Sequence, residues 1–311
     1  MNAGAVIVTG AGGFVCSEVV LALHKAGCDV LAVDLMFDAS TKTRLAGILQ
    51  IEGQLADVLA SGAIGPVRGV IHGAAITASP ERLGISKATH IRRNMDLLTT
   101  TLDFAHGAGA SWFLFISSMG VFGSNDAPLQ KGCFTEATQP TATCTYCAAK
   151  HAGELLTTSA GQDGFATLSL RLGNIFGRHE ALRETRQNLC LVSRMLAEAQ
   201  SNGLITVQTP EAVREWSWLP DLALTIACLI QDFPITGPRV LHAGTPPTIT
   251  DFDLARAIAA RIHGVTIRLA SPPFEPTRPP MGCGAASVFA GTNWTTMEAA
   301  LDEMIQMAVP S

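Results

Sequence analysis

Short apolar runs alternate along the first half of the chain with longer segments in which apolar residues recur at helical spacing. A short run rich in Val, Ile and Leu is typical of a buried strand, whereas the helical spacing is typical of a helix packed on one face. The pattern predicts strands near 5–9, 29–34, 67–72, 111–117 and 164–171 and helices near 13–26, 80–107 and 145–161. A further strand near 48–53 has the weakest pattern. This alternation predicts an α/β fold with a parallel sheet covered by helices on both faces.

Beyond residue 174 the order of elements changes. We expect a helix at 188–202, a strand at 204–208, a helix at 221–230, a strand at 240–242, a helix starting at 251–253, a strand at 265–269 and a final helix after Trp294. The proline-rich segment 271–280 predicts a loop. Because 311 residues exceed one small domain, a large α/β domain with a smaller appendage is expected.

Composition narrows the class of protein. An apolar share of 48% with 15% charged residues is typical of a compact enzyme, and a net charge of −5 without a basic stripe argues against a nucleic-acid partner. The sequence contains no apolar run long enough to cross a membrane and no cationic leader before its first strand, so we expect a cytoplasmic protein. The histidines are scattered without metal-ligand spacing, and no metal is expected.

The first predicted strand runs into a glycine-rich turn, Thr9-Gly10-Ala11-Gly12-Gly13-Phe14-Val15, which helical periodicity follows. Glycines at such a turn let backbone N–H groups approach a pyrophosphate, and the helix directs its positive end at the same charge. The second strand ends in Asp34, about twenty residues on, where a carboxylate hydrogen-bonds a ribose diol and repels a 2′-phosphate. The pattern therefore predicts NAD, and not NADP, as cofactor.

Tyr146 is the only tyrosine of the chain and stands four residues before Lys150. A phenol has an ordinary pKa of about 10 and is a poor base at neutral pH, but a cation one helical turn away stabilises the phenolate. Lys150 and a positively charged nicotinamide are together expected to lower the pKa of Tyr146 toward about 7. Ser118 would hydrogen-bond the reacting oxygen. An ordinary helix pair of Tyr146 and Lys150 is the alternative that this spacing leaves open.

These segments, in this order, resemble the extended short-chain dehydrogenase/reductase family of NAD-dependent epimerases and dehydratases. The resemblance covers nearly the whole chain and extends to Gly53-Gln54-Leu55, to Ile71-His72-Gly73-Ala74-Ala75, to residues 116–123 and to residues 171–177. It implies a doubly wound parallel-sheet Rossmann fold with a smaller, discontinuous C-terminal substrate domain. The NAD-binding domain would comprise 1–174 and about 219–235, and the substrate domain about 175–218 and 236–311. Helices 80–107 and 145–161 resemble those that form homodimers in the family.

The same resemblance implies roles for individual residues. The catalytic set would be Ser118, Tyr146 and Lys150. NAD would contact Gly10, Gly12, Gly13, Phe14, Val15, Asp34, Gln54, Leu55, Ala74, Ala75, Asn94, Tyr146 and Lys150. A sugar-type substrate would contact Ser118, Met119, Asn174, His179, Arg214 and Arg278.

Departures from the family pattern bear on the reaction. Cys16 replaces the third glycine of the turn, and Arg178, with His179 and Arg183, adds positive charge near the expected substrate mouth, which suits an anionic substrate. Sugar 4,6-dehydratases of this type place an acid pair directly after the active-site hydroxyl, where this chain has Met119 and Gly120. Epimerases acting at carbons 3 and 5 use a cysteine there. Both reactions are therefore disfavoured.

Three functions remain open. The leading interpretation is an NAD-dependent oxidoreductase or epimerase acting on a secondary alcohol of a sugar nucleotide, whose diphosphate Asn174, Arg214 and Arg278 would contact. The first alternative is a dehydrogenase or reductase of a free sugar, sugar acid or lactone. The second is a non-catalytic NAD-binding sensor. At the residue level, Arg214 has a structural alternative as the ion-pair partner of Glu211 or Glu215.

Eight cysteines are spread along the chain, and the only close pair is Cys144 and Cys147, which flank Tyr146. The pair lacks a second pair or nearby histidines for a zinc site. We expect reduced thiols, and a redox role for this pair is left as an alternative.

Overall fold

The computed structural model describes residues 4–123, 132–141, 144–183, 188–234, 236–237, 239–244, 246–272, 278–283, 289 and 291–308. Its larger part alternates strands and helices along the chain. In order, these are β1 (Ala5–Thr9), α1 (Phe14–Lys25), β2 (Val30–Asp34), α2 (Ala39–Arg44), β3 (Leu49–Glu52), α3 (Leu55–Ala60), β4 (Val67–His72), α4 (Lys87–Gly107), β5 (Trp112–Ser118), the 3₁₀ turn η1 (Met119–Val121), α5 (Thr145–Ala160) and β6 (Ala166–Leu172). Two later elements, α7 (Leu219–Gln231) and β10 (Val240–His242), join them.

A seven-stranded sheet with the order β10-β6-β5-β4-β1-β2-β3 forms the centre, and its neighbouring strands are all parallel. The chain runs outward from β1 to β3 and then returns to β4 on the other side of β1. In a doubly wound sheet, this reversal opens a crevice beyond the carboxyl ends of the strands. The predicted α/β fold and its Rossmann-type sheet are confirmed.

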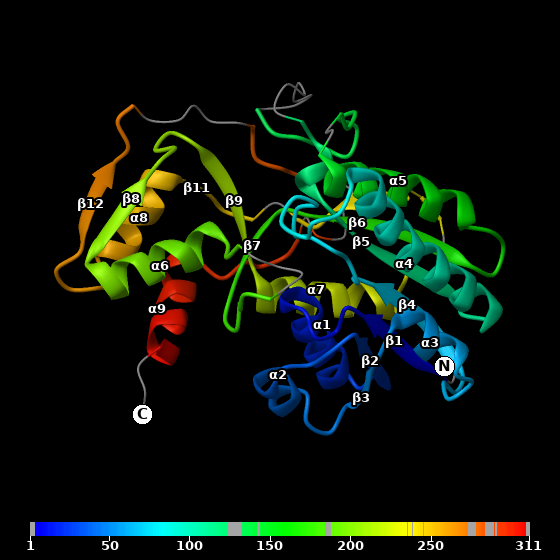
Figure 1. Ribbon diagram of the computed structural model, residues 1–311. Coiled ribbons are helices and arrows are strands. Elements are labelled where there is room, and N and C mark those ends of the chain that lie inside the picture. The colour runs from blue at the N-terminus through cyan, green and yellow to red at the C-terminus, as the bar shows by residue number, and fades with distance from the viewer. Residues whose placement is uncertain are drawn as a thin grey trace.

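Two apolar layers hold helices against the sheet, as expected of strands buried on both faces. On one face α1 and α7 pack against β1, β2 and β6. This cluster includes Val19 of α1, Ile226 of α7 and Leu168 of β6. On the other face α3 and α4 contribute Leu55 and Leu98 to a second cluster. The helices α4 and α5 lie side by side over this face (Figure 1).

A smaller part of the molecule carries two short sheets of its own. One has the order β11-β9-β7 and the other pairs β12 with β8. Its elements are β7 (Asn174–Phe176), α6 (Leu191–Asn202), β8 (Leu204–Val207), β9 (Val213–Trp218), β11 (Thr248–Thr250), α8 (Asp251–Ala259), β12 (Thr266–Leu269) and α9 (Met297–Ala308). A separate apolar cluster that includes Phe176, Met195, Trp216 and Leu254 fills it. These elements gather on the left of Figure 1, apart from α3 and α4.

Several boundaries differ from the sequence expectations. The helix expected at 80–107 begins at Lys87, because Ser86 caps it by accepting the Thr89 N–H, and turns that include Pro80 and Gly84 precede it. The strand near 48–53 is present as the edge strand β3. Within the expected loop 271–280, residues 273–277 lie outside the described residues. The proposed boundaries of the two domains stay a prediction.

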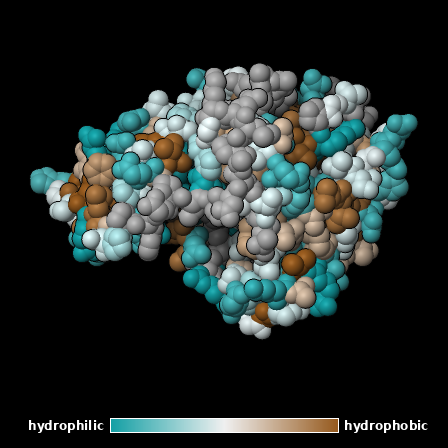
Figure 2. Space-filling model, turned by 90° about the horizontal axis from the view of Figure 1, so that it is seen from above, coloured by the Kyte–Doolittle hydropathy of each residue, from teal (hydrophilic) through white to brown (hydrophobic). Residues whose placement is uncertain are grey.

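The surface is mixed in polarity. Exposed apolar side chains lie as separate spots on the face shown in Figure 2. Leu155 and Leu156 of α5 are among the exposed apolar residues, but the homodimer stays a prediction. Among the described helices, none combines the length and the apolar character that a membrane span requires.

Candidate active site

A cavity of about 1130 Å³ opens at the carboxyl ends of the parallel strands, where the sheet order reverses. It extends from the glycine turn to the small mixed sheet. Most of the predicted site residues line it: Gly10, Gly12, Gly13, Phe14, Val15, Asp34, Gln54, Leu55, Ala74, Ala75, Ser118, Tyr146, Lys150, Asn174, His179 and Arg214. Residues from segments far apart in sequence thus meet around one space.

The glycine turn packs so closely against neighbouring backbone that it admits no side chain at Gly10 or Gly12. A Cβ at Gly12 would lie 2.6 Å from the Met36 carbonyl oxygen and 3.0 Å from Asp34 Oδ2. Gly10 has a φ of 72°, and its Cβ would collide with the backbone of Ala74 at 2.7 Å. Backbone thus approaches backbone closely at the N-terminus of α1, as a pyrophosphate cradle requires. The turn fits a dinucleotide.

Cys16, which replaces the third glycine, is buried beneath this turn. A Cβ at Gly73 would lie only 2.2 Å from Cys16 Sγ. The glycine after β4 therefore makes space for the thiol, and α1 keeps its close approach to the sheet.

Asp34 ends β2 at the rim of the cavity. Its Oδ2 accepts the Gly12 N–H at 2.8 Å, so the carboxylate is tied to the glycine turn. Burial raises the pKa of Asp34, against the lowering effect of this backbone hydrogen bond. The position beside the turn suits a carboxylate that binds a ribose diol.

Asn94 does not line this cavity. Its Oδ1 accepts the Ile76 N–H at 2.9 Å, and its Nδ2 donates to the carbonyls of Ile76 and His90. The side chain thus fixes the loop that follows β4 and carries Ala74 and Ala75. Its expected contact with NAD stays a prediction.

Tyr146 and Lys150 occupy the first turns of α5. Lys150 is buried, and its Nζ donates to the Ile116 carbonyl at 2.7 Å and lies 5.7 Å from the centroid of the Tyr146 ring. Burial lowers the pKa of Lys150 to about 8. The ammonium is therefore held between β5 and the phenol, where it can stabilise a phenolate.

Ser118 ends β5 and faces the same cavity. Behind it, the buried Glu154 of α5 accepts two hydrogen bonds from the Arg171 guanidinium, at 2.8 and 2.7 Å, and one from Ser117 Oγ at 2.5 Å. This network ties α5 to β5 and β6 and fixes the direction in which Tyr146 and Ser118 enter the cavity.

Arg214 lies on β9 at the far end of the cavity. Its guanidinium pairs with Asp251 at the start of α8, with Nε 2.8 Å from Oδ1 and Nη2 3.1 Å from Oδ2. The structural alternative that named Glu211 or Glu215 was therefore wrong about the partner. Because Asp251 is buried and Arg214 is 26% exposed, the carboxylate orients a cation that still reaches the cavity.

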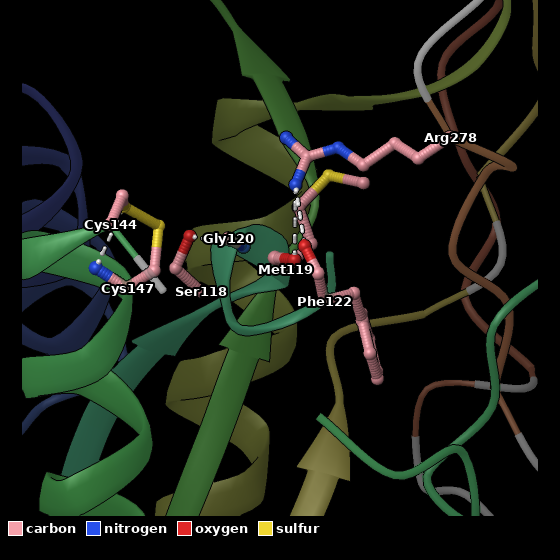
Figure 3. Close-up of a disulfide and its surroundings, with 7 residues drawn as sticks. All are labelled: Ser118, Met119, Gly120, Phe122, Cys144, Cys147 and Arg278. Carbon is pink, nitrogen blue, oxygen red and sulfur yellow. Dashed lines mark hydrogen bonds between the residues drawn. A yellow bond between two sulfur atoms is a disulfide. The ribbon is translucent and has the colours of Figure 1, made fainter. Parts of the chain in front are cut away.

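Two predicted substrate residues lie outside the cavity lining. Met119 is buried in a small apolar cluster with Phe122 and Phe134. Arg278 donates to the Met119 and Phe122 carbonyls at 3.4 Å and so holds the turn after Ser118 (Figure 3). Their direct contact with substrate stays a prediction.

The extra positive charge expected around residue 178 is largely compensated. Arg178 pairs with Glu303 of α9, and Arg183 pairs with Asp38, the N-cap of α2. Burial and the neighbouring Arg44 and Arg178 lower the pKa of His179 to about 4, so its imidazole is neutral at pH 7. The attraction of an anionic substrate by this segment stays a prediction.

The expectation of reduced thiols at Cys144 and Cys147 was also wrong. The structure joins them in a disulfide across the first turn of α5. Figure 3 shows this disulfide beside Ser118. Within the described residues, no cluster of three or more metal-ligating side chains occurs.

Residues 6–244 match the family described as NAD dependent epimerase/dehydratase. The chain belongs to this family. No curated protein matches it in sequence.

Several solved structures share the fold of this chain over nearly its whole length. An NAD-dependent NDP-hexosamine 5,6-dehydratase involved in tunicamycin biosynthesis is 16% identical, with a TM-score of 0.77 and 99% of each chain covered. A UDP-glucose 4-epimerase from Thermus thermophilus, in complex with NAD, is 20% identical, with a TM-score of 0.76, covering 98% of this chain and 100% of that one. A dTDP-glucose 4,6-dehydratase from Bacillus anthracis, also with NAD, is 16% identical, with a TM-score of 0.78 and coverages of 98% and 96%.

Several cavity residues were missed by sequence reasoning. They come from α4, α6 and the segment before β9, and include Arg93, Asp96, Thr100, Arg194, Gln208 and Thr209. Arg93 and Asp96 sit on a long amphipathic helix, where charged residues usually form a solvated face. Only the packing of α4 beside the cavity distinguishes these positions, so the sequence carried no signal for them.

Proposed function

We propose that this protein catalyses NAD-dependent hydride transfer at a secondary alcohol of a sugar nucleotide, with Tyr146 as the base. The observation that carries the proposal is the meeting of Tyr146, Lys150 and Ser118 with the glycine turn and Asp34 around one cavity. An ordinary helix pair of Tyr146 and Lys150 would not need a buried ammonium beside the cofactor turn.

The cofactor end of the cavity supports NAD. The N–H groups of the turn at Gly12 and Gly13 and the start of α1 would hold the pyrophosphate, and Asp34 would hold the adenosine ribose. Gln54 and Leu55 would contact the adenine. When bound, NAD supplies the hydride acceptor.

The proton is handled by side chains of this chain. Tyr146, as phenolate, takes the hydroxyl proton of the substrate, and Lys150 keeps the phenolate available at neutral pH. Ser118 orients the alcohol and stabilises the carbonyl oxygen that develops, an effect that is typically a few kcal/mol for such a donor (~3).

The far end of the cavity supports an anionic substrate group. Arg214 of β9 and Arg194 of α6 line it. Asn174 lines the same cavity and, in the sequence, lies between the catalytic residues and these two arginines. Two guanidinium groups beside one cavity suit the oxygens of a diphosphate. Asp251 fixes the orientation of Arg214 and thereby the position of that group.

The turn after Ser118 favours simple hydride transfer over dehydration. Elimination of water needs an added acid and base beside the hydride step, whereas Met119 is apolar and buried and Gly120 has no side chain. The family includes dehydratases, and the comparisons do not favour one reaction over the other. We therefore infer epimerisation or net oxidation from these residues alone.

The test is to incubate the NAD-loaded protein with UDP-, GDP- and dTDP-sugars and, separately, with free sugars, uronates and lactones. Reduced NAD is followed by absorbance, and products by mass and configuration. The proposal expects an inverted or oxidised sugar nucleotide, and Tyr146→Phe should abolish turnover while leaving NAD affinity unchanged.

Other outcomes assign the alternatives. Turnover of a small sugar acid alone would make the protein a free-sugar dehydrogenase, and loss of one water from the product would make it a dehydratase. NAD that is never reduced, together with no inverted, oxidised or otherwise altered product from any substrate, would favour a sensor. Near-normal turnover by Tyr146→Phe would exclude Tyr146 as the base.

A further inference from the structure

The disulfide brackets the proposed base. Cys144 is the N-cap of α5, its Sγ accepts the Cys147 N–H at 3.1 Å, and Tyr146 lies between the two half-cystines. Cys144 is exposed, whereas Cys147 is half-buried. An exposed first sulfur and a sheltered second one, in a Cys-x-x-Cys segment at a helix N-terminus, suit thiol–disulfide exchange.

The sheltered sulfur touches the loop that carries Ser118. A Cβ placed at Gly120 would lie 3.5 Å from Cys147 Sγ and 3.2 Å from Ser118 Oγ. The Gly120 N–H donates to Ser118 Oγ at 3.0 Å. Figure 3 shows these groups packed together, with Ser118 beside the disulfide. A change at Cys147 therefore reaches both sides of the proposed catalytic centre.

This disulfide contributes little to the stability of the whole fold. It joins residues only three positions apart, and so short a loop constrains the unfolded chain weakly. It lies within one helical turn and connects no distant elements. Cys16, Cys28, Cys190 and Cys228, by contrast, carry free thiols.

We propose that Cys144 and Cys147 form a thiol–disulfide exchange site that controls the neighbouring centre, with the disulfide as the active form and the dithiol as the slow form. Its effect on turnover rests on the function proposed above. The exchange itself does not, because it needs only the two sulfurs and an external thiol.

The exchange balances with a small-molecule thiol or a dithiol protein as reductant. An external thiolate attacks the exposed Cys144 sulfur, the bond between the two sulfurs breaks, and Cys147 leaves as a thiolate that then takes a proton from solvent. A second external thiolate then attacks the mixed disulfide. The protein gains two electrons and two protons as a dithiol, and the reductant leaves as a disulfide. The reverse sequence restores the active form.

Reduction would disturb the centre through packing. Two thiols need more room than one disulfide, and Cys147 Sγ has Gly120 and Ser118 on one side. In the proposed slow form, the Cys147 thiol displaces the first turn of α5 relative to the loop and carries Tyr146 away from Ser118. A displacement of ångström scale at a catalytic group costs up to about 100-fold in rate.

The experiment uses the full-length protein equilibrated in glutathione buffers of increasing reducing strength. Rapid alkylation and mass spectrometry give the redox state of each cysteine, hydrogen exchange follows the peptide around Tyr146, and turnover is measured on the same samples. Variant Cys144→Ser/Cys147→Ser is the test protein, and Cys228→Ser, at an exposed free thiol on α7, is the matched control.

The expected result is reversible reduction of the Cys144–Cys147 disulfide, detected as alkylation of both cysteines, with faster hydrogen exchange around Tyr146 and a fall in turnover of about tenfold or more, all with one midpoint. The double variant should be slow and indifferent to glutathione, whereas Cys228→Ser should respond like the parent protein. Should the double variant not fold, the parent and the control carry the test.

The proposal would be overturned if the pair were reduced while hydrogen exchange around Tyr146 and turnover stayed unchanged. Free thiols at both positions in oxidising buffer would overturn it as well. If no substrate is ever turned over but hydrogen exchange around Tyr146 still follows the redox state of the pair, the proposed function fails and the thiol–disulfide exchange site stands.

Discussion

Replacing Lys150 by methionine removes the cation on which the proposed base depends. Its Nζ lies 5.7 Å from the centre of the Tyr146 ring. At an effective dielectric constant of about 20, two unit charges at this separation interact by about 3 kcal/mol, which corresponds to about 2 pKa units. Lys150→Met should therefore raise the pKa of Tyr146 by about 2 units and lower turnover at neutral pH by about 100-fold.

The pKa change can be measured directly, because Tyr146 is the only tyrosine. The ultraviolet absorbance of the phenolate, followed against pH in the NAD-free protein, reports this one side chain. Lys150→Arg keeps a charge and is the matched control, and the thermal melting of all three proteins shows whether the fold is retained. An unchanged titration in a folded Lys150→Met protein would refute the assignment of Lys150.

The same lysine sets the expected pH dependence. Since burial lowers the pKa of Lys150 to about 8, the ammonium is present below this pH and is lost as the pH rises through it. The ratio kcat/KM of the parent protein should therefore fall above a pH of about 8. In Lys150→Arg this fall should be absent, because a guanidinium keeps its proton. A fall at the same pH in both proteins would contradict the reasoning.

Two further substitutions test the cofactor cradle and the support of α5. Gly12→Ala should weaken NAD binding, measured by calorimetry, about tenfold or more, since its Cβ would lie 2.6 Å from a carbonyl oxygen. Gly65→Ala, at an open position, is the control and should leave the affinity for NAD unchanged. Equal affinities of the two variants would exclude the glycine turn as the NAD cradle. Glu154→Gln breaks the buried pair with Arg171 and should lower the free energy of unfolding in urea by about 3–5 kcal/mol. Glu303→Gln, in a more exposed ion pair, should cost less than about 1 kcal/mol; similar losses in both would contradict this.

The features that the sequence predicts well are local. The glycine turn, Asp34 and the pair Tyr146 and Lys150 are defined by spacing within one strand, turn or helix, and all of them line the cavity. The buried strands of the central sheet were predictable because their apolar runs are continuous. The edge strand β3 was weaker for the same reason, since Leu49 and Glu52 are exposed there.

The features that the sequence could not supply depend on tertiary contacts. The pairing of Arg214 with Asp251 joins residues 37 positions apart, while nearer glutamates offer an equally plausible partner by charge. The strands β7 and β11 have three residues each and exist only because β9 lies between them. Arg178 and Arg183 find their ion-pair partners on α9 and at the N-cap of α2, far away in the sequence. For Cys144 and Cys147 the spacing was visible, but spacing alone does not give an oxidation state.

The separate apolar cluster of the small sheets has a consequence for how the protein can change. Arg194 and Arg214, at the substrate end of the cavity, belong to elements that this cluster supports, whereas Asp34, Ser118 and Lys150 are supported by the central sheet. A library of substitutions confined to α6 and β9 would explore new substrates without disturbing the cofactor cradle. Under the proposed function, substrate recognition and the chemical step would rest on separate apolar clusters and could change independently.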